Sequence, residues 1–218
     1  MNSRVSIKFL VMAAEAISLF SFSPARAQSN RTWVSPLGND NQNCSFKNPC
    51  RTFSGAQAKT NPGGEIVVQE SGGFGDVHIT KSITINGGGK YAGIQTPGFG
   101  DAITIQAAAT DVVVLRGLTL VGLGGANGIR TISVGTLRVE HCAISDFAQD
   151  GIQVGGAAKL FVQDTVITEC GTDGIYVLPP TKALIDHCRL ENNGHGVRLA
   201  TSTEETVRDT VAAGNMNY

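Results

Sequence analysis

Two acidic side chains recur at a spacing that could place them side by side in the folded chain. Asp150 and Asp173 each stand directly before a glycine, about 23 residues apart, and Asn127 and His195 occupy the matching places on either side. If the repeats stack, the carboxylates lie about one strand spacing, roughly 4.8 Å, apart. Such a pair repels, shares a proton or holds a cation such as calcium. Asn and Asp are also common turn residues, so a purely structural explanation stays open.

A second column stands two residues after each of these glycines. It consists of Arg130, Gln153, Tyr176 and Arg198. An outward strand position has no turn geometry to satisfy, so its side chains are freer to serve function. The phenol could stack on a sugar ring, and the guanidinium groups could pair with uronate carboxylates. A solvated sheet face is the alternative, but we expect this column to be the substrate-binding surface.

A third column contains two histidines. Its members are Gly117, His141, Asp164, His187 and Asp209. Histidine beside aspartate suggests a zinc site or a proton relay. However, a turn that needs a left-handed residue selects these same residue types. We therefore favour the turn and predict no metal site.

The elements that must position these columns are short strands. Residues 137–154 align with residues 160–177, and again, with one deletion, with residues 183–199. Apolar and polar residues alternate in three runs per repeat, as in Leu137 and Val139. Alternation with period two indicates strands, and a repeat of 20 to 50 residues indicates a solenoid. The sequence predicts an all-β, three-sheet parallel β-helix with coils of about 22–23 residues.

Composition narrows the possible partners. The 218 residues include 17 Lys and Arg against 18 Asp and Glu, for a net charge of -1. Binding to a phosphate backbone needs an excess of basic side chains, so we expect no nucleic-acid partner. The 27 glycines agree with strands interrupted by tight turns.

The first 27 residues have the composition of a secretory signal peptide. Arg4 and Lys8 precede an apolar stretch that ends at the small-x-small pattern Ala25-Arg26-Ala27. We predict cleavage before Gln28, a secreted or periplasmic protein, and no membrane span after signal removal.

The cysteines divide into two groups. Cys44 and Cys50 lie in a loop rich in Gly, Asn and Pro, and we expect them to form a disulfide after export. Cys142, Cys170 and Cys188 fall within the repeats, where we expect buried free thiols. The predicted organisation is a loop and cap over residues 28–64, followed by the β-helix over residues 65–218.

The repeats resemble those of exported right-handed β-helix proteins of the pectin-lyase-like superfamily. The resemblance rests on the coil pattern, on the opening Trp33-Val34-Ser35, and on a recurring Gly-Ile or Gly-Val pair. These pairs are Gly128-Ile129, Gly151-Ile152, Gly174-Ile175 and Gly196-Val197. It implies a right-handed solenoid, whereas activity varies within the superfamily.

Three functions are consistent with this resemblance, and no catalytic residue can be assigned. We prefer an exported protein that binds a polysaccharide or cell-surface glycan without a cofactor. The alternatives are a calcium-dependent polysaccharide lyase that uses Asp150, Asp173 and Arg198, and a structural solenoid or adhesin fragment. The segments Thr172–Ile175 and Gly194–Gly196 resemble polygalacturonase motifs, but Gly171 replaces the asparagine of that family and its paired aspartates are missing.

The last repeat is incomplete in this sequence. It begins at Val207 and stops before a third strand can form. An uncovered coil presents unpaired backbone groups and apolar side chains. We therefore expect a loosely ordered end that tends to self-associate. The alternatives are an irregular lid formed by residues 201–218 and a shortened member of a longer family.

Overall fold

The computed structural model describes residues 28–201 and 203–217. The predicted signal peptide, residues 1–27, lies outside the described residues. Among the residues that are described, no helix is long and apolar enough to cross a membrane.

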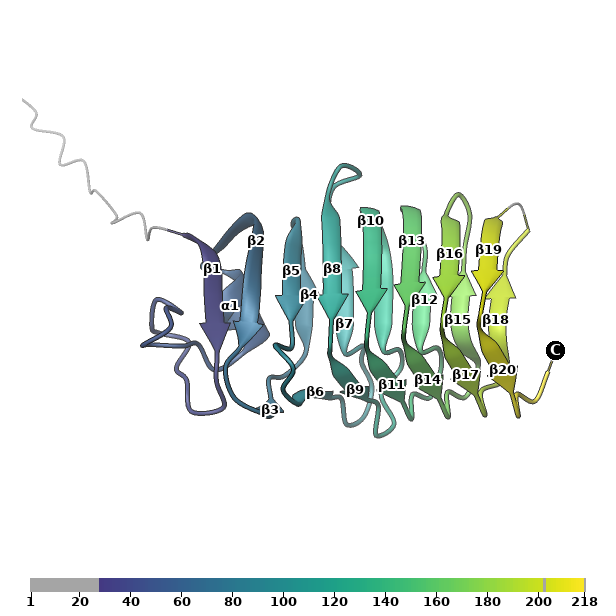
Figure 1. Ribbon diagram of the computed structural model, residues 1–218, viewed down its shortest axis with the longest axis horizontal. Coiled ribbons are helices and arrows are strands. Elements are labelled where there is room, and N and C mark those ends of the chain that lie inside the picture. Colours follow the sequence, from purple (N-terminus) through teal and green to yellow (C-terminus); the bar gives the residue numbers. More distant parts are fainter. Residues whose placement is uncertain (1–27, 202, 218) are drawn as a thin grey trace, which may run out of the picture.

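The described chain winds into a parallel β-solenoid of three sheets, which we call A, B and C (Figure 1). Sheet A contains β1 (Ser29–Val34), β2 (Thr60–Val68), β5 (Ile83–Asn86), β8 (Val112–Arg116), the second half of β10 (Ile129–Glu140), β13 (Ala157–Gln163), β16 (Lys182–Asp186) and β19 (Glu204–Arg208). Sheet B contains β3 (Gly72–Gly73), β6 (Ala92–Gln95), β9 (Thr119–Val121), β11 (Ala143–Ser145), β14 (Val166–Thr168), β17 (Arg189–Glu191) and β20 (Val211–Ala213). Sheet C contains β4 (Val77–Ile79), β7 (Ile103–Gln106), the first half of β10, β12 (Ile152–Val154), β15 (Asp173–Val177) and β18 (His195–Leu199).

Each strand pairs with its equivalent in the neighbouring coils. Ile129 pairs with Ile152, Ile152 with Ile175, and Ile175 with Val197. This register confirms the predicted coil length of about 22–23 residues for the C-terminal half. The earlier coils are less regular, since Ile129 also pairs with Ile103 across a longer connection.

In the regular coils, one side chain in two along a strand points into the solenoid. Ile152, Val154 and Ile175 are fully buried, whereas Gln153 and Tyr176 between them are half-buried on the outside. The glycines before these strands allow the coils to approach closely, because a Cβ atom on Gly151 would collide with Ile167 and with the carbonyl oxygen of Gly174. Gly151 is therefore required by packing and not by a positive φ angle.

The corner between sheets A and B has the left-handed conformation predicted for it. His141, Asp164 and His187 have φ angles of 54°, 49° and 53°. Gly117 and Asp209, at the same corner in the flanking coils, also have positive φ angles. The need for a left-handed residue thus explains this column without a metal.

The cysteines behave as predicted. Cys44 and Cys50 form a disulfide. Cys142, Cys170 and Cys188 are free and buried, and burial is the main cause that raises the pKa of each thiol, to about 11 for Cys142 and about 12 for Cys170.

The N-terminal segment is more ordered than the predicted loop and cap. Residues 28–64 contain β1, which pairs in parallel with β2 and so extends sheet A, and the short helix α1 (Phe53–Gln57). Asp40 connects loop and helix, since its Oδ1 accepts hydrogen bonds from the backbone N–H groups of Arg51 and Thr52. The sequence does not predict β1, because an irregular connection separates this strand from its partner β2.

The last described coil is formed by paired strands, which is more order than the loosely ordered end expected from the sequence. Its strands β19 and β20 consist entirely of exposed residues, including Val207 and Val211. Val197 and Leu199 of β18, the last strand of sheet C among the described residues, are only partly buried against the core. The apolar interior of the solenoid therefore continues to the surface at this end of the described chain.

Candidate functional site

The four residues predicted to bind substrate form one continuous row on the outer face of sheet C. Arg130 pairs with Gln153, Gln153 with Tyr176, and Tyr176 with Arg198 in adjacent strands. Thr104 of β7 extends the row by one coil. Successive members are thus about 4.8 Å apart along the solenoid.

Carboxyl groups at the start of these strands anchor the row. Gln153 Nε2 donates to Asp150 Oδ2 at 2.9 Å, and Arg130 Nη1 lies 3.5 Å from Asp101 Oδ2. Asp101 was not singled out in the sequence, because the irregular spacing of the earlier coils hides its equivalence to Asp150. The anchoring reduces the conformational entropy that the row would lose on binding a ligand.

The predicted Asp150 and Asp173 pair is present, and both residues are buried. Their side chains continue a hydrogen-bonded ladder between coils. Asn127 Oδ1 accepts the backbone N–H of Asp150 at 3.2 Å, and Asp150 Oδ1 accepts the backbone N–H of Asp173 at 3.1 Å. Asn127 and Asp150 thus provide hydrogen-bond acceptors for backbone N–H groups of the next coil. The sequence predicted only a local turn at these positions.

Asp173 is fully buried and carries two basic partners. His195 Nδ1 lies 2.7 Å from its Oδ1, and Arg198 Nε and Nη2 each lie 2.6 Å from its Oδ2. The hydrogen bond with Asp173 raises the pKa of Arg198 above its ordinary value. A guanidinium with a raised pKa stays protonated near neutral pH and so has no free lone pair to accept a proton, which weighs against Arg198 as the base of a lyase.

Asp150, in contrast to the paired Asp173, lies where its ionised form is disfavoured. Burial, together with the negative charge of Asp173, raises the pKa of its carboxyl from 3.8 to about 6, although the hydrogen bond from Gln153 opposes this. Asp150 therefore takes up a proton as the pH falls toward about 6. Both carboxyl groups already have several hydrogen-bond partners, so a cation between them would have to displace side chains such as Arg198.

Arg198 also covers one face of the Tyr176 ring. Its guanidinium carbon lies 3.8 Å from the centroid of the Tyr176 ring. A sugar could stack on that side of the phenol only if Arg198 moved away. Arg130 has a 45 % exposed side chain and, among the described residues, one ion pair of 3.5 Å, so it is the arginine of the row best placed to meet an anionic ligand.

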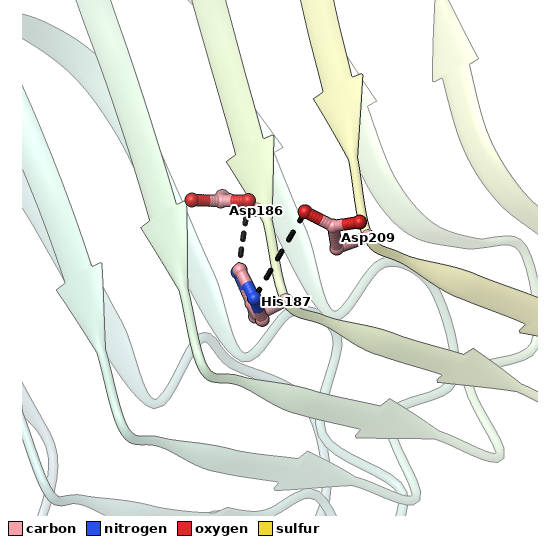
Figure 2. Close-up of side chains that lie close together, drawn as sticks. All are labelled: Asp186, His187 and Asp209. Atoms are coloured by element: carbon pink, nitrogen blue, oxygen red, sulfur yellow. Dashed lines mark hydrogen bonds and ion pairs between the residues drawn. The ribbon is translucent and has the colours of Figure 1, made fainter.

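A separate cluster lies at the corner between sheets A and B. Figure 2 shows the side chains of Asp186, His187 and Asp209 close together. His187 Nδ1 lies 2.9 Å from Asp186 Oδ1, and its Nε2 lies 3.9 Å from Asp209 Oδ2. Arg208 Nη2 pairs with Asp186 Oδ2 at 2.8 Å, so this carboxylate already has a cationic partner. The left-handed backbone and these ion pairs explain the cluster, and we assign no metal to it.

Sequence reasoning missed a second ladder inside the solenoid. Asn193 Oδ1 accepts the backbone N–H of Cys170 at 3.0 Å, and Asn215 Oδ1 accepts that of Asn193 at 2.9 Å. Both asparagines are buried. The spacing of one coil between the two asparagines could have indicated the ladder. However, an Asn next to a Gly usually indicates an exposed turn.

Comparison with known families agrees with this geometry. The family model described as right handed beta helix region matches residues 66–218. The chain belongs to the right-handed β-helix family. This membership gives the hand of the solenoid and is consistent with the pectin-lyase-like superfamily. No curated protein and no solved structure matches the chain. The β-helix family is defined by its fold, so the function has to be argued from the surface of this protein.

Proposed function

We propose that this β-helix protein is exported and binds a polysaccharide or cell-surface glycan along the outer face of sheet C. The observation that carries the proposal is the in-register row of Arg130, Gln153, Tyr176 and Arg198, anchored from behind by carboxyl groups. An extended polymer lying across the coils would meet one of these side chains about every 4.8 Å. A glycan chain, which is itself a repeat of polar units, matches such a surface.

The charge on this face favours an acidic glycan. Arg198 is neutralised by Asp173, whereas Arg130 keeps most of its guanidinium available. A guanidinium binds a carboxylate through two parallel hydrogen bonds, which gives both energy and orientation. In this proposal Arg130 contacts a uronate carboxylate, and Gln153 and Tyr176 contact neighbouring hydroxyl groups.

Export is supported by two observations. The first 27 residues have the composition of a signal peptide, and the Cys44–Cys50 disulfide is of the kind that persists in oxidising compartments. Intact-mass measurement of the secreted protein tests this part directly. Gln28 is the expected first residue, and retention of residues 1–27 would contradict it.

A glycan array tests binding. The purified protein should bind uronate-containing polysaccharides saturably, without turnover. Absence of binding to every glycan would contradict the proposal. Growth of unsaturated-uronide absorbance on pectate or alginate with calcium would establish the lyase alternative instead.

We also propose that the open last coil promotes self-association. Val207 and Val211 are exposed in β19 and β20, each of which has one paired edge among the described strands. Sedimentation should show concentration-dependent oligomers that the double substitution Val207→Asp and Val211→Asp reduces. A wild-type chain that stays monomeric at high concentration would refute this proposal.

A further inference from the structure

A cleft opens at the N-terminal end of the solenoid, on the outer face of sheet A. Its volume is about 470 Å³. It is lined by Trp33, Phe46, Val67, Val68, Gln69 and Glu70. None of these residues belongs to the proposed glycan-binding face, so the cleft is a separate feature.

Two aromatic rings form adjoining walls of the cleft. The centroids of Trp33 and Phe46 are 5.9 Å apart, and their planes meet at 88°. Phe46 is 66 % exposed although it is a large apolar side chain. The two rings pack edge to face, and a ligand in the angle beside them can contact both.

The backbone around these rings is fixed before any ligand binds. Trp33 donates its N–H to the carbonyl oxygen of Cys44 at 2.8 Å and accepts the N–H of Cys50 at 2.9 Å, and the two cysteines form the disulfide. Gln69 Nε2 donates to the carbonyl oxygen of Phe46 at 2.7 Å. A preformed cleft of this kind loses little conformational entropy when a ligand enters.

The polar groups of the cleft are mainly acceptors. Gln69 uses its amide nitrogen to hold Phe46, and its Oε1 accepts no side-chain hydrogen bond within the described part of the chain. Glu70 Oε2 accepts a hydrogen bond from Ser35 Oγ at 2.9 Å, and Glu70 forms no ion pair within residues 28–201 and 203–217. A carboxylate beside two aromatic rings favours a positively charged ligand, since the faces of the rings also carry partial negative charge.

We propose that this cleft binds an alkylammonium group, such as a quaternary or methylated amine. The methyl groups contact Trp33 and Phe46, the positive charge is attracted by the ring faces, and Glu70 supplies the counter-charge. A sugar ring would fit the aromatic walls equally well but would gain less from Glu70. The charge of the ligand is therefore the property to test.

Trp33 is the single tryptophan of the chain, so its fluorescence reports on the cleft alone. The probes are choline chloride and 3,3-dimethylbutan-1-ol, which has the shape of choline without the charge. We expect a saturable fluorescence change with choline and about tenfold weaker binding of the neutral alcohol. Equal affinity for the two probes, or no saturable change with choline, would overturn the proposal.

Three variants locate the effect. Phe46→Ala should abolish the choline response, and Glu70→Gln should weaken it about tenfold while keeping an acceptor for Ser35. Phe99→Ala removes a fully exposed phenylalanine elsewhere and should change nothing. Circular dichroism checks that each variant folds. If Phe46→Ala does not fold, Glu70→Gln decides, and unchanged choline affinity in that variant would refute the role of the carboxylate.

Discussion

Replacing Asp150 by Asn should stabilise the protein at neutral pH. Asp150 is buried next to Asp173, and its carboxyl pKa is raised mainly by burial. The neutral amide avoids the cost of ionisation while keeping an oxygen for the backbone N–H of Asp173. Asn127 already makes this same contact to Asp150 one coil earlier. Gln153 can turn its amide so that its oxygen accepts from the new Asn side chain.

The magnitude follows from the pKa of Asp150. A carboxyl whose pKa is raised from 3.8 to about 6 stabilises the fold fully only below about pH 4 and loses this contribution as the pH rises through 6. At 1.36 kcal/mol per pH unit, the difference is at most about 3 kcal/mol at pH 7. Asp150→Asn should therefore gain up to about 3 kcal/mol at pH 7 and almost nothing near pH 4.

Urea denaturation of both proteins at pH 4, 5.5 and 7 measures this gain. The difference between the two proteins at each pH removes the contribution of all other titrating groups, provided that the m-values agree. A gain that is independent of pH would mean that ionisation of Asp150 is not its cause. A less stable variant at pH 7 would show that the carboxylate is needed in its charged form.

Two further pairs of substitutions test the strand phase and the corner. Ile152→Ala removes a fully buried side chain and should lower the unfolding free energy by about 2–5 kcal/mol. Thr168→Ala, on an outer face, should lower it by less than about 1 kcal/mol. Equal losses in chemical denaturation would show that the predicted strand phase is wrong. His187→Gly should leave the melting temperature nearly unchanged because glycine tolerates the φ angle of 53°, while His187→Val should cost about 1–2 kcal/mol. If His187→Val were as stable as His187→Gly, backbone conformation would not explain the histidine.

The regular half of the fold could be predicted from sequence because its pattern is local. Alternation in Leu137 and Val139 gives the strand phase, and the repeat gives the partner of each strand. The left-handed corner was predictable for a similar reason, since His141 and Asp164 belong to the few residue types that tolerate it. The N-terminal strand β1 was missed because its partner lies beyond an irregular loop.

The site was predictable only in part. The row of outward residues follows from the strand phase, so Arg130 and Gln153 lie side by side as expected. The conformations of the side chains do not follow from it. Arg198 turns onto Tyr176 and toward the buried Asp173 of the preceding coil, an arrangement that depends on packing between coils. Alternation with period two determines on which face of the sheet a residue lies. The partners of its side chain depend on how the coils pack against one another.

The affinity of one bound glycan for two arginine variants tests the central claim most directly. Arg130 on sheet C and Arg116 on sheet A are matched, with side chains 45 % and 47 % exposed. For the glycan that binds best on the array, Arg130→Ala should raise Kd about tenfold or more, and Arg116→Ala should change it less than about twofold. Equal effects of the two substitutions, or no effect of Arg130→Ala, would contradict binding along the outer face of sheet C.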